Sequence, residues 1–176
     1  IGFMKESRRF YPNKELGSQV LAYVGTENVG LGVLEAADNK TILGHPGTVL
    51  VQSDARRRAF SRIERSPTSG ATLELTIDEY LQHIVERELE AGVKAHKAEG
   101  GTAVVMDPAT GEILAMASYP TFNPNLFSTS RPEQRKNRAV TDLYEPGSTF
   151  KLATASAAIE EGVISPNDPV DVSEGL

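Results

Sequence analysis

The sequence contains no cysteine, and only 6% of its residues are aromatic. The absence of cysteine excludes a disulfide framework, thiolate metal sites and cysteine nucleophiles. Long apolar runs are also missing: the longest are short stretches such as 103–106 and 113–117, well below the roughly 18 residues of a membrane-spanning helix. No basic stretch followed by an apolar one stands at the N-terminus, so no signal peptide is predicted.

The composition is that of a folded protein. Of the 176 residues 39% are hydrophobic, and 15 are glycine, which makes a packed core possible. This length predicts one domain or parts of two. Because the chain begins at Ile1 rather than Met and ends in a turn-like stretch at 173–176, we interpret it as an internal piece of a longer protein.

Charge is unevenly distributed along the chain. Residues 1–70 carry 10 basic and 7 acidic residues (+3), and residues 71–176 carry 8 and 17 (−9), which sums to −6. This asymmetry suggests two structural units. A cluster of arginines, Arg56, Arg57, Arg58, Arg62 and Arg65, is compatible with a nucleic-acid patch. Phe60 is the only aromatic residue around it for base stacking, so we interpret the cluster as a solvated face and expect no nucleic acid.

Turn-forming residues at 66–70 coincide with the change of charge and mark a predicted boundary. The part before the boundary is irregular and β-rich, with a short apolar element at 19–25, a loop at 30–32 and a strand at 47–53. After the boundary, alternating apolar residues predict a strand at 71–77.

A helix is predicted from residue 79 to about 98. Thr76 and Glu79 have the spacing of a capping box, and Asp78 is the competing cap. The apolar stripe consists of Leu81, Ile84, Val85, Leu89 and Val93, and the opposite, charged face of Glu86, Arg87, Glu90, Lys94 and Lys97. We interpret Glu86, Glu88 and Glu90 as solvated. His45, His83 and His96 lack the spacing of metal ligands, so no metal is expected.

Three further elements follow. Two apolar runs at 102–107 and 112–118 are joined by a turn ending in Gly111, which predicts a hairpin. Residues 119–147 have no clear period, and a loop of such length is usually functional. An alanine-rich helix is predicted from 148 to about 161, ending at Gly162.

The candidate chemistry lies at the start of this last helix. Ser148 and Lys151 are three residues apart, so a helix places both on one face. A serine hydroxyl needs an adjacent base to become a nucleophile, and a lysine can serve as that base in its neutral form, which burial and nearby cations favour. The helix start presents free N–H groups that favour developing negative charge. Gly147 allows the substrate to approach the backbone closely. The S-x-x-K pattern alone is also compatible with a serine-capped helix and a solvated lysine.

The surrounding residues resemble one family. Segment 138–151, RAVTDLYEPGSTFK, is similar to the active-serine segment of class B penicillin-binding proteins, and its Glu145 most resembles the cell-division branch. The resemblance covers nearly the whole chain in the same order. It includes the opening of the transpeptidase domain at 75–78, its first hairpin at 104–116, the following loop at 119–125, and the pedestal motifs at 9–12 and 30–35.

This resemblance implies an α+β fold. Residues 1–66 would be the C-terminal part of the pedestal (dimerisation-like) domain. Residues 67–176 would be the N-terminal part of an incomplete, serine β-lactamase-like transpeptidase domain. The parent protein would be a septal peptidoglycan D,D-transpeptidase working through a serine acyl-enzyme. Ser148 would be the nucleophile and Lys151 the base, with Gly147, Glu145 and Tyr119 as substrate-binding candidates.

No cofactor is implied. The expected partners are peptidoglycan stem peptides ending in D-Ala-D-Ala, β-lactams, a septal glycosyltransferase and other division proteins. The protein would sit at the bacterial cytoplasmic membrane, held by an anchor not in this chain, with its catalytic part on the outer face.

The chain departs from the family pattern in two places. Asp38 stands where the pedestal usually has an aromatic residue, and the downstream S-x-N and K-T-G motifs that complete the site are not identified. The isolated chain is therefore expected to acylate poorly. The alternatives are a β-lactamase or penicillin-sensor relative on the same fold, or a non-catalytic interaction module of the division machinery.

Overall fold

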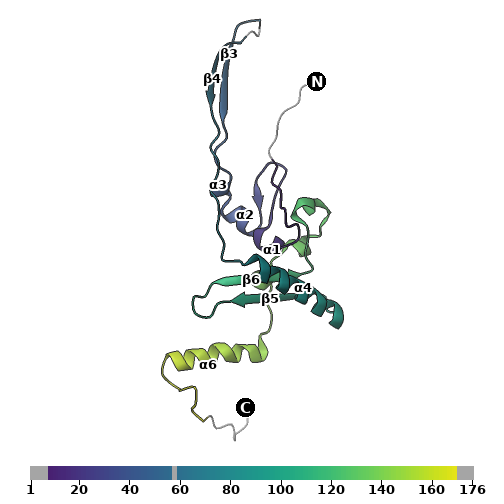
Figure 1. The fold of residues 1–176 in the computed structure, drawn as a ribbon, viewed down its shortest axis with the longest axis vertical. Helices are drawn as coiled ribbons and strands as arrows, with labels where there is room; N and C mark the ends of the chain where they lie inside the picture. The colour runs from purple at the N-terminus through teal and green to yellow at the C-terminus, as the bar shows by residue number, and fades with distance from the viewer. Residues whose placement is uncertain (1–7, 57–58, 170–176) are drawn as a thin grey trace. The chain divides into compact units, whose positions relative to one another are not determined.

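The computed structural model describes residues 8–56 and 59–169 (Figure 1). Contacts divide the chain into two compact units, Ile1–Thr141 and Asp142–Leu176. The fold is mixed α+β, as expected. The first unit contains α1 (Ser18–Leu21), β1 (Tyr23–Val24), β2 (Gly30–Leu31), α2 (Val33–Ala37), α3 (Asn39–Ile42), β3 (Thr48–Ser53), β4 (Ala59–Arg65), α4 (Glu79–His96), β5 (Gly101–Met106), β6 (Ile113–Tyr119), the 3-10 turns η1 (Pro124–Thr129) and η2 (Pro132–Arg135), and α5 (Arg138–Thr141). The second unit contains η3 (Gly147–Thr149) and α6 (Phe150–Glu160).

The predicted hairpin at 102–118 is confirmed. Strands β5 and β6 pair in antiparallel register from Gly101↔Tyr119 to Met106↔Ile113. Gly111 ends the turn with φ 78°, a left-handed conformation that costs glycine little. Helix α4 packs against this hairpin (Figure 1), and Val93, Ala115 and Ala117 are buried.

The predicted helix at 79–98 is confirmed as α4, but its cap is the competing one. The Asp78 carboxylate accepts a hydrogen bond from the Leu81 N–H (2.8 Å). The Thr76–Glu79 capping box is wrong, because the Thr76 hydroxyl instead donates to the carbonyl oxygen of Ile113 (2.7 Å). Thr76 is thus used to attach the chain to β6 rather than to begin the helix.

The predicted strand at 71–77 is also wrong. Within the described residues this segment pairs with no strand, and Leu73 and Leu75 remain 37% and 39% exposed. The apolar residues alternate as in a strand, but a β-strand also needs a neighbouring strand with which its backbone can form hydrogen bonds. The Thr76 bond attaches this segment to β6, and just after it the Asp78 N–H donates to the carbonyl of Leu114 (2.8 Å).

Strand β3 confirms the strand predicted at 47–53, and it pairs with β4 (Figure 1). Its side chains are all exposed, including Val49 (51%) and Leu50 (59%). In the arginine cluster Arg56 and Arg65 are exposed, as a solvated face requires, whereas Arg57 and Arg58 lie outside the described residues. Residues 19–25 form α1 and β1, and the loop predicted at 30–32 contains the two-residue strand β2.

The second unit is a helix preceded by one tight turn. Helix α6 confirms the helix predicted at 148–161, although the first two residues of the predicted range, Ser148 and Thr149, lie in η3. Gly162 adopts φ 66°, and the N–H of Val163 returns to the Ala158 carbonyl (2.9 Å), which closes the C-terminus as expected. The apolar side chains of Phe150 (62%) and Leu152 (76%) are exposed. None of the helices in the described ranges is long and apolar enough to cross a membrane.

Candidate active site

Ser148 lies in η3, the single 3-10 turn from which α6 continues without a break. The turn is closed by the Thr149 N–H, which donates to the Pro146 carbonyl (3.1 Å), and by the Thr149 hydroxyl, which donates to the same oxygen (2.6 Å). Pro146 has helical φ and ψ values of −70° and −24°, so the proline ring fixes the backbone just before the turn. Ser148 is exposed at the start of a helix, where N–H groups lack intrahelical acceptors.

Gly147 adopts a left-handed conformation, with φ 53°. A residue with a Cβ atom is strained there by about 1–2 kcal/mol. No heavy atom lies within 4 Å of the position that a Cβ at Gly147 would occupy, apart from its chain neighbours. The glycine is therefore required by the backbone of the turn, and it leaves open space next to Ser148.

Lys151 is the second residue of α6, one helical turn after Ser148, so the two side chains leave the same face. Both are exposed, and within the described residues neither side chain makes a hydrogen bond or an ion pair. The unit thus carries a hydroxyl and an amine on the same face of the helix start. Glu145 is exposed directly before this turn.

Tyr119 belongs to the first unit, Ile1–Thr141. It is the last residue of β6, opposite Gly101, and a cis peptide bond joins it to Pro120. Phe122, which follows, is only 4% exposed and packs edge-on against Tyr23, with ring centroids 5.9 Å apart. Phe122 is therefore a packing residue of the loop.

One triplet has the letters of an S-x-N motif, Ser165-Pro166-Asn167. It forms a turn in which the Ser165 N–H donates to the Asp168 carboxylate (2.8 Å). This turn follows the C-terminus of α6, and the 11 residues of that helix rise about 16 Å. Ser165 is thus a helix length away from Ser148 and does not contribute to the same site.

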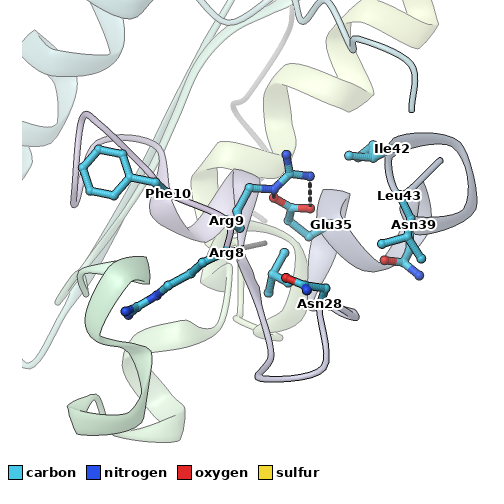
Figure 2. A pocket seen from close by; sticks show the side chains of 9 residues that line it. Arg8, Arg9, Phe10, Asn28, Glu35, Asn39, Ile42 and Leu43 are labelled. Carbon is cyan, nitrogen blue, oxygen red and sulfur yellow. Dashed lines mark hydrogen bonds and ion pairs between the residues drawn. The ribbon is translucent and has the colours of Figure 1, made fainter. Parts of the chain in front are cut away.

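The two pedestal-like motifs, 9–12 and 30–35, meet in space (Figure 2). Arg9 forms an ion pair with Glu35 through Nε and Oε1 (3.1 Å) and a hydrogen bond through Nη2 and Oε2 (3.1 Å). The Tyr11 hydroxyl donates to the same Oε1 (3.0 Å). Burial, together with this bond to Glu35, raises the pKa of Tyr11 well above its ordinary value of 10. Figure 2 shows Arg9 directed at Glu35, while Arg8 points away.

Two polar residues of α4 were missed as structural residues by the sequence reasoning. Gln82 is 1% exposed and bonds to the backbone of Met116. Glu86 accepts N–H bonds from Gln82 and from Gly17, both at 2.7 Å, so its interpretation as a solvated residue is wrong. Burial raises the pKa of Glu86, although both hydrogen bonds act in the opposite direction. A signal was present, because 82 and 86 share the helical register of 89 and 93.

Comparison with known proteins identifies the family of this chain. A family model described as the penicillin binding protein transpeptidase domain matches residues 101–176, a range that includes Ser148 and Lys151. Peptidoglycan D,D-transpeptidase FtsI of Escherichia coli K12 is 39% identical over 168 residues, which are 95% of this chain and 29% of that protein. The probable peptidoglycan D,D-transpeptidase PenA of Neisseria gonorrhoeae is 34% identical over 170 residues, with 94% and 29% covered. The chain belongs to the class B penicillin-binding proteins.

Solved structures of penicillin-binding proteins have the same fold over this range. The crystal structure of penicillin binding protein 3 from Mycobacterium tuberculosis, complexed with aztreonam, superposes with a TM-score of 0.71 and 30% identity. The match covers 92% of this chain and 33% of that one. The chain therefore spans about a third of the length of the penicillin-binding proteins that it matches.

Proposed function

We propose that the protein carrying this chain is a peptidoglycan D,D-transpeptidase that cross-links stem peptides during septal cell-wall synthesis. The observation that carries the proposal is the placement of Ser148 on the turn that opens α6 with Lys151 one helical turn later. This pair lies within the range matched by the transpeptidase family. The 39% identity to FtsI supports the septal role.

In the proposed reaction, the Ser148 hydroxyl attacks the carbonyl carbon of the penultimate D-Ala of a stem peptide. The Lys151 amine would accept the hydroxyl proton, and the terminal D-Ala would leave with a proton on its amine. An amine from a neighbouring stem then attacks the acyl-enzyme. This attack forms the cross-link and releases Ser148. The N–H of Ser148 would donate to the oxyanion of each tetrahedral intermediate.

The parts of the chain have separate roles in this proposal. Residues 1–66 would be the end of the pedestal, and residues 67–176 the beginning of the transpeptidase domain, a sheet covered by helices. Gly147, Glu145 and Tyr119 would contact the substrate. β-Lactams would acylate Ser148 as mimics of D-Ala-D-Ala. The protein would work with a septal glycosyltransferase and other division proteins on the outer face of the cytoplasmic membrane.

The test is labelling of the natural protein that contains this sequence with a fluorescent penicillin. Ser148→Ala should abolish covalent labelling. Ser156→Ala, which changes another exposed serine of α6, should label like the wild type. Equal labelling of Ser148→Ala and the wild type would show that the nucleophile is elsewhere. Rapid loss of the label by hydrolysis would favour a β-lactamase.

A further inference from the structure

Two buried side chains of the first unit each carry an oxygen that is not hydrogen-bonded to any described residue. These atoms are the Oγ of Ser118 and the Oδ1 of Asn137, in residues that are 4% and 3% exposed. A buried polar atom without a partner loses its bonds to bulk water and gains none in return. Nearly all such atoms in folded proteins are therefore bonded to protein or to an ordered water molecule.

Asn137 stands directly before α5. Its backbone carbonyl accepts hydrogen bonds from the N–H groups of Val140 and Thr141, both at 3.1 Å. An asparagine at the start of a helix commonly uses its side-chain oxygen to accept from another N–H of the first turn. The Oδ1 of Asn137 does not do so among the described residues, and its Nδ2 group donates to the Sδ of Met116 (3.1 Å). The amide is thus directed at β6 and not at its own helix.

Ser118 points to the same side of β6 as Met116. Both residues belong to this strand, and side chains two residues apart in a strand leave the same face, about 7 Å from one another. Helix α5 packs against β5 and β6. Because the Asn137 amide contacts the Met116 side chain, the two unpaired oxygens lie on one side of the strand.

A third buried atom without a hydrogen bond in the described part of the chain is the Nε of Arg135. Its guanidinium is held at Tyr23, because Nη1 donates to the Tyr23 hydroxyl (2.9 Å) and the group lies over the ring, 5.4 Å from its centroid. Ser118 and Asn137 have no such alternative for their oxygens.

We infer that Ser118 Oγ and Asn137 Oδ1 share one bound water molecule, which joins β6 to the start of α5. Water suits this pair, because it donates to the amide oxygen, which only accepts, and either donates to or accepts from the hydroxyl. Buried waters typically make about three hydrogen bonds to polar groups that lack other partners. Two neutral oxygens do not offset the charge of a cation. The inference does not depend on the function proposed above.

A crystal structure of the natural protein that contains this sequence, at a resolution that shows ordered water, is the direct test. One water should lie within about 3.2 Å of both Ser118 Oγ and Asn137 Oδ1. A direct hydrogen bond between these two side chains would overturn the inference. So would a bond of either oxygen to another protein group, or the absence of ordered water between them.

Hydrogen exchange of the amides of residues 138–141 tests the link in solution. Ser118→Ala removes one partner of the water, so exchange in α5 should rise about threefold or more, although no direct hydrogen bond joins Ser118 to α5 among the described residues. Thr102→Val is the matched control. Thr102 is the exposed cross-strand neighbour of Ser118, so its hydroxyl leaves the same face of the hairpin, and its loss should not change exchange in α5.

Unchanged exchange in Ser118→Ala, or an equal rise in Ser118→Ala and Thr102→Val, would show that α5 is not held through Ser118 and would overturn the link. If Ser118→Ala does not fold, the crystal structure of the wild type decides, since it needs no variant.

Discussion

The side chain of Gln82 pairs with the backbone of Met116 as a neighbouring strand would. Its Nε2 donates to the Met116 carbonyl and its Oε1 accepts from the Met116 N–H, both at 2.8 Å. Helix α4 thus satisfies the outer edge of β6 at this residue, and the same amide continues to Glu86. One buried side chain links a helix, a strand and, through Glu86, the backbone of Gly17.

Replacing Gln82 by leucine should therefore destabilise the fold. The variant keeps the volume but leaves the N–H and carbonyl of Met116 without partners, which costs about 1–3 kcal/mol for each buried group. Urea denaturation of the chain would measure the loss. Gln52→Leu, at an exposed position of β3, is the control and should stay within about 0.5 kcal/mol of the wild type. Equal stability of the two variants would contradict the role of Gln82.

Glu86 should make stability depend on pH. Burial raises the pKa of Glu86 above its ordinary value of 4.5, so the folded state holds this proton more tightly than the unfolded state. The resulting stabilisation is full below pH 4.5 and is lost as the pH rises through the raised pKa. Glu86→Gln retains an acceptor for Gly17 and Gln82 and removes this loss. The melting temperature of Glu86→Gln should therefore rise relative to that of the wild type as the pH is raised from 4 to 7.

The exposed neighbour Glu88 provides the control for this experiment. Glu88→Gln removes the same charge from the same helix. The difference in melting temperature between Glu88→Gln and the wild type should change less between pH 4 and pH 7 than the difference for Glu86→Gln. A constant difference between Glu86→Gln and the wild type at all pH values would contradict the role of burial.

Tyr11 should resist ionisation in the folded protein. Its raised pKa means that the stabilisation from the neutral phenol is present below pH 10 and is lost as the pH rises through the raised value. In an alkaline titration followed by phenolate absorbance, the wild type and Tyr11→Phe should differ only well above pH 10. In denaturant the difference should appear near pH 10. A difference near pH 10 in the folded protein would show that Tyr11 is accessible.

Lys151 is expected to act as the base of acylation. Lys151→Ala in the natural protein should slow acylation by a fluorescent penicillin by about 10²–10⁴-fold, the usual contribution of a general base. Lys151→Arg should not restore the rate, because a guanidinium stays protonated. Lys94→Ala changes an exposed lysine paired with Glu90 and should acylate normally. A normal acylation rate for Lys151→Ala would show that Lys151 is not the base.

The elements defined by local pattern were predictable. The hairpin of β5 and β6, the helix α4 and the helix α6 each follow from periodicity and a terminating glycine or cap. The segment 71–77 shows the limit of this reasoning, because alternation specifies which face of a strand is buried and not whether a partner strand exists. The cap of α4 was also undecided, since Thr76 and Asp78 are equally suited until Thr76 is bonded to Ile113.

The candidate site was predictable only in part. Ser148 and Lys151 follow from a short motif and its surroundings. Other buried contacts, such as those of Gln19 with Pro120 and of Asn125 with Tyr11, join residues more than a hundred positions apart in the sequence. No local period encodes such contacts. Buried amides that bond to backbone become visible only when the backbone is folded.

Helix α6 has a consequence for the reactivity of Ser148. An isolated helix of 11 residues is marginal in water, and α6 carries exposed apolar side chains such as Phe150 and Leu152 beside its polar ones. The N–H groups at Ser148 and the spacing to Lys151 exist only while the first turn of α6 is intact. The proposed reactivity of Ser148 therefore depends on how stable this helix is along its whole length. Substitutions at Leu152 or Ile159 would act on catalysis by fraying the helix, without touching the reacting atoms.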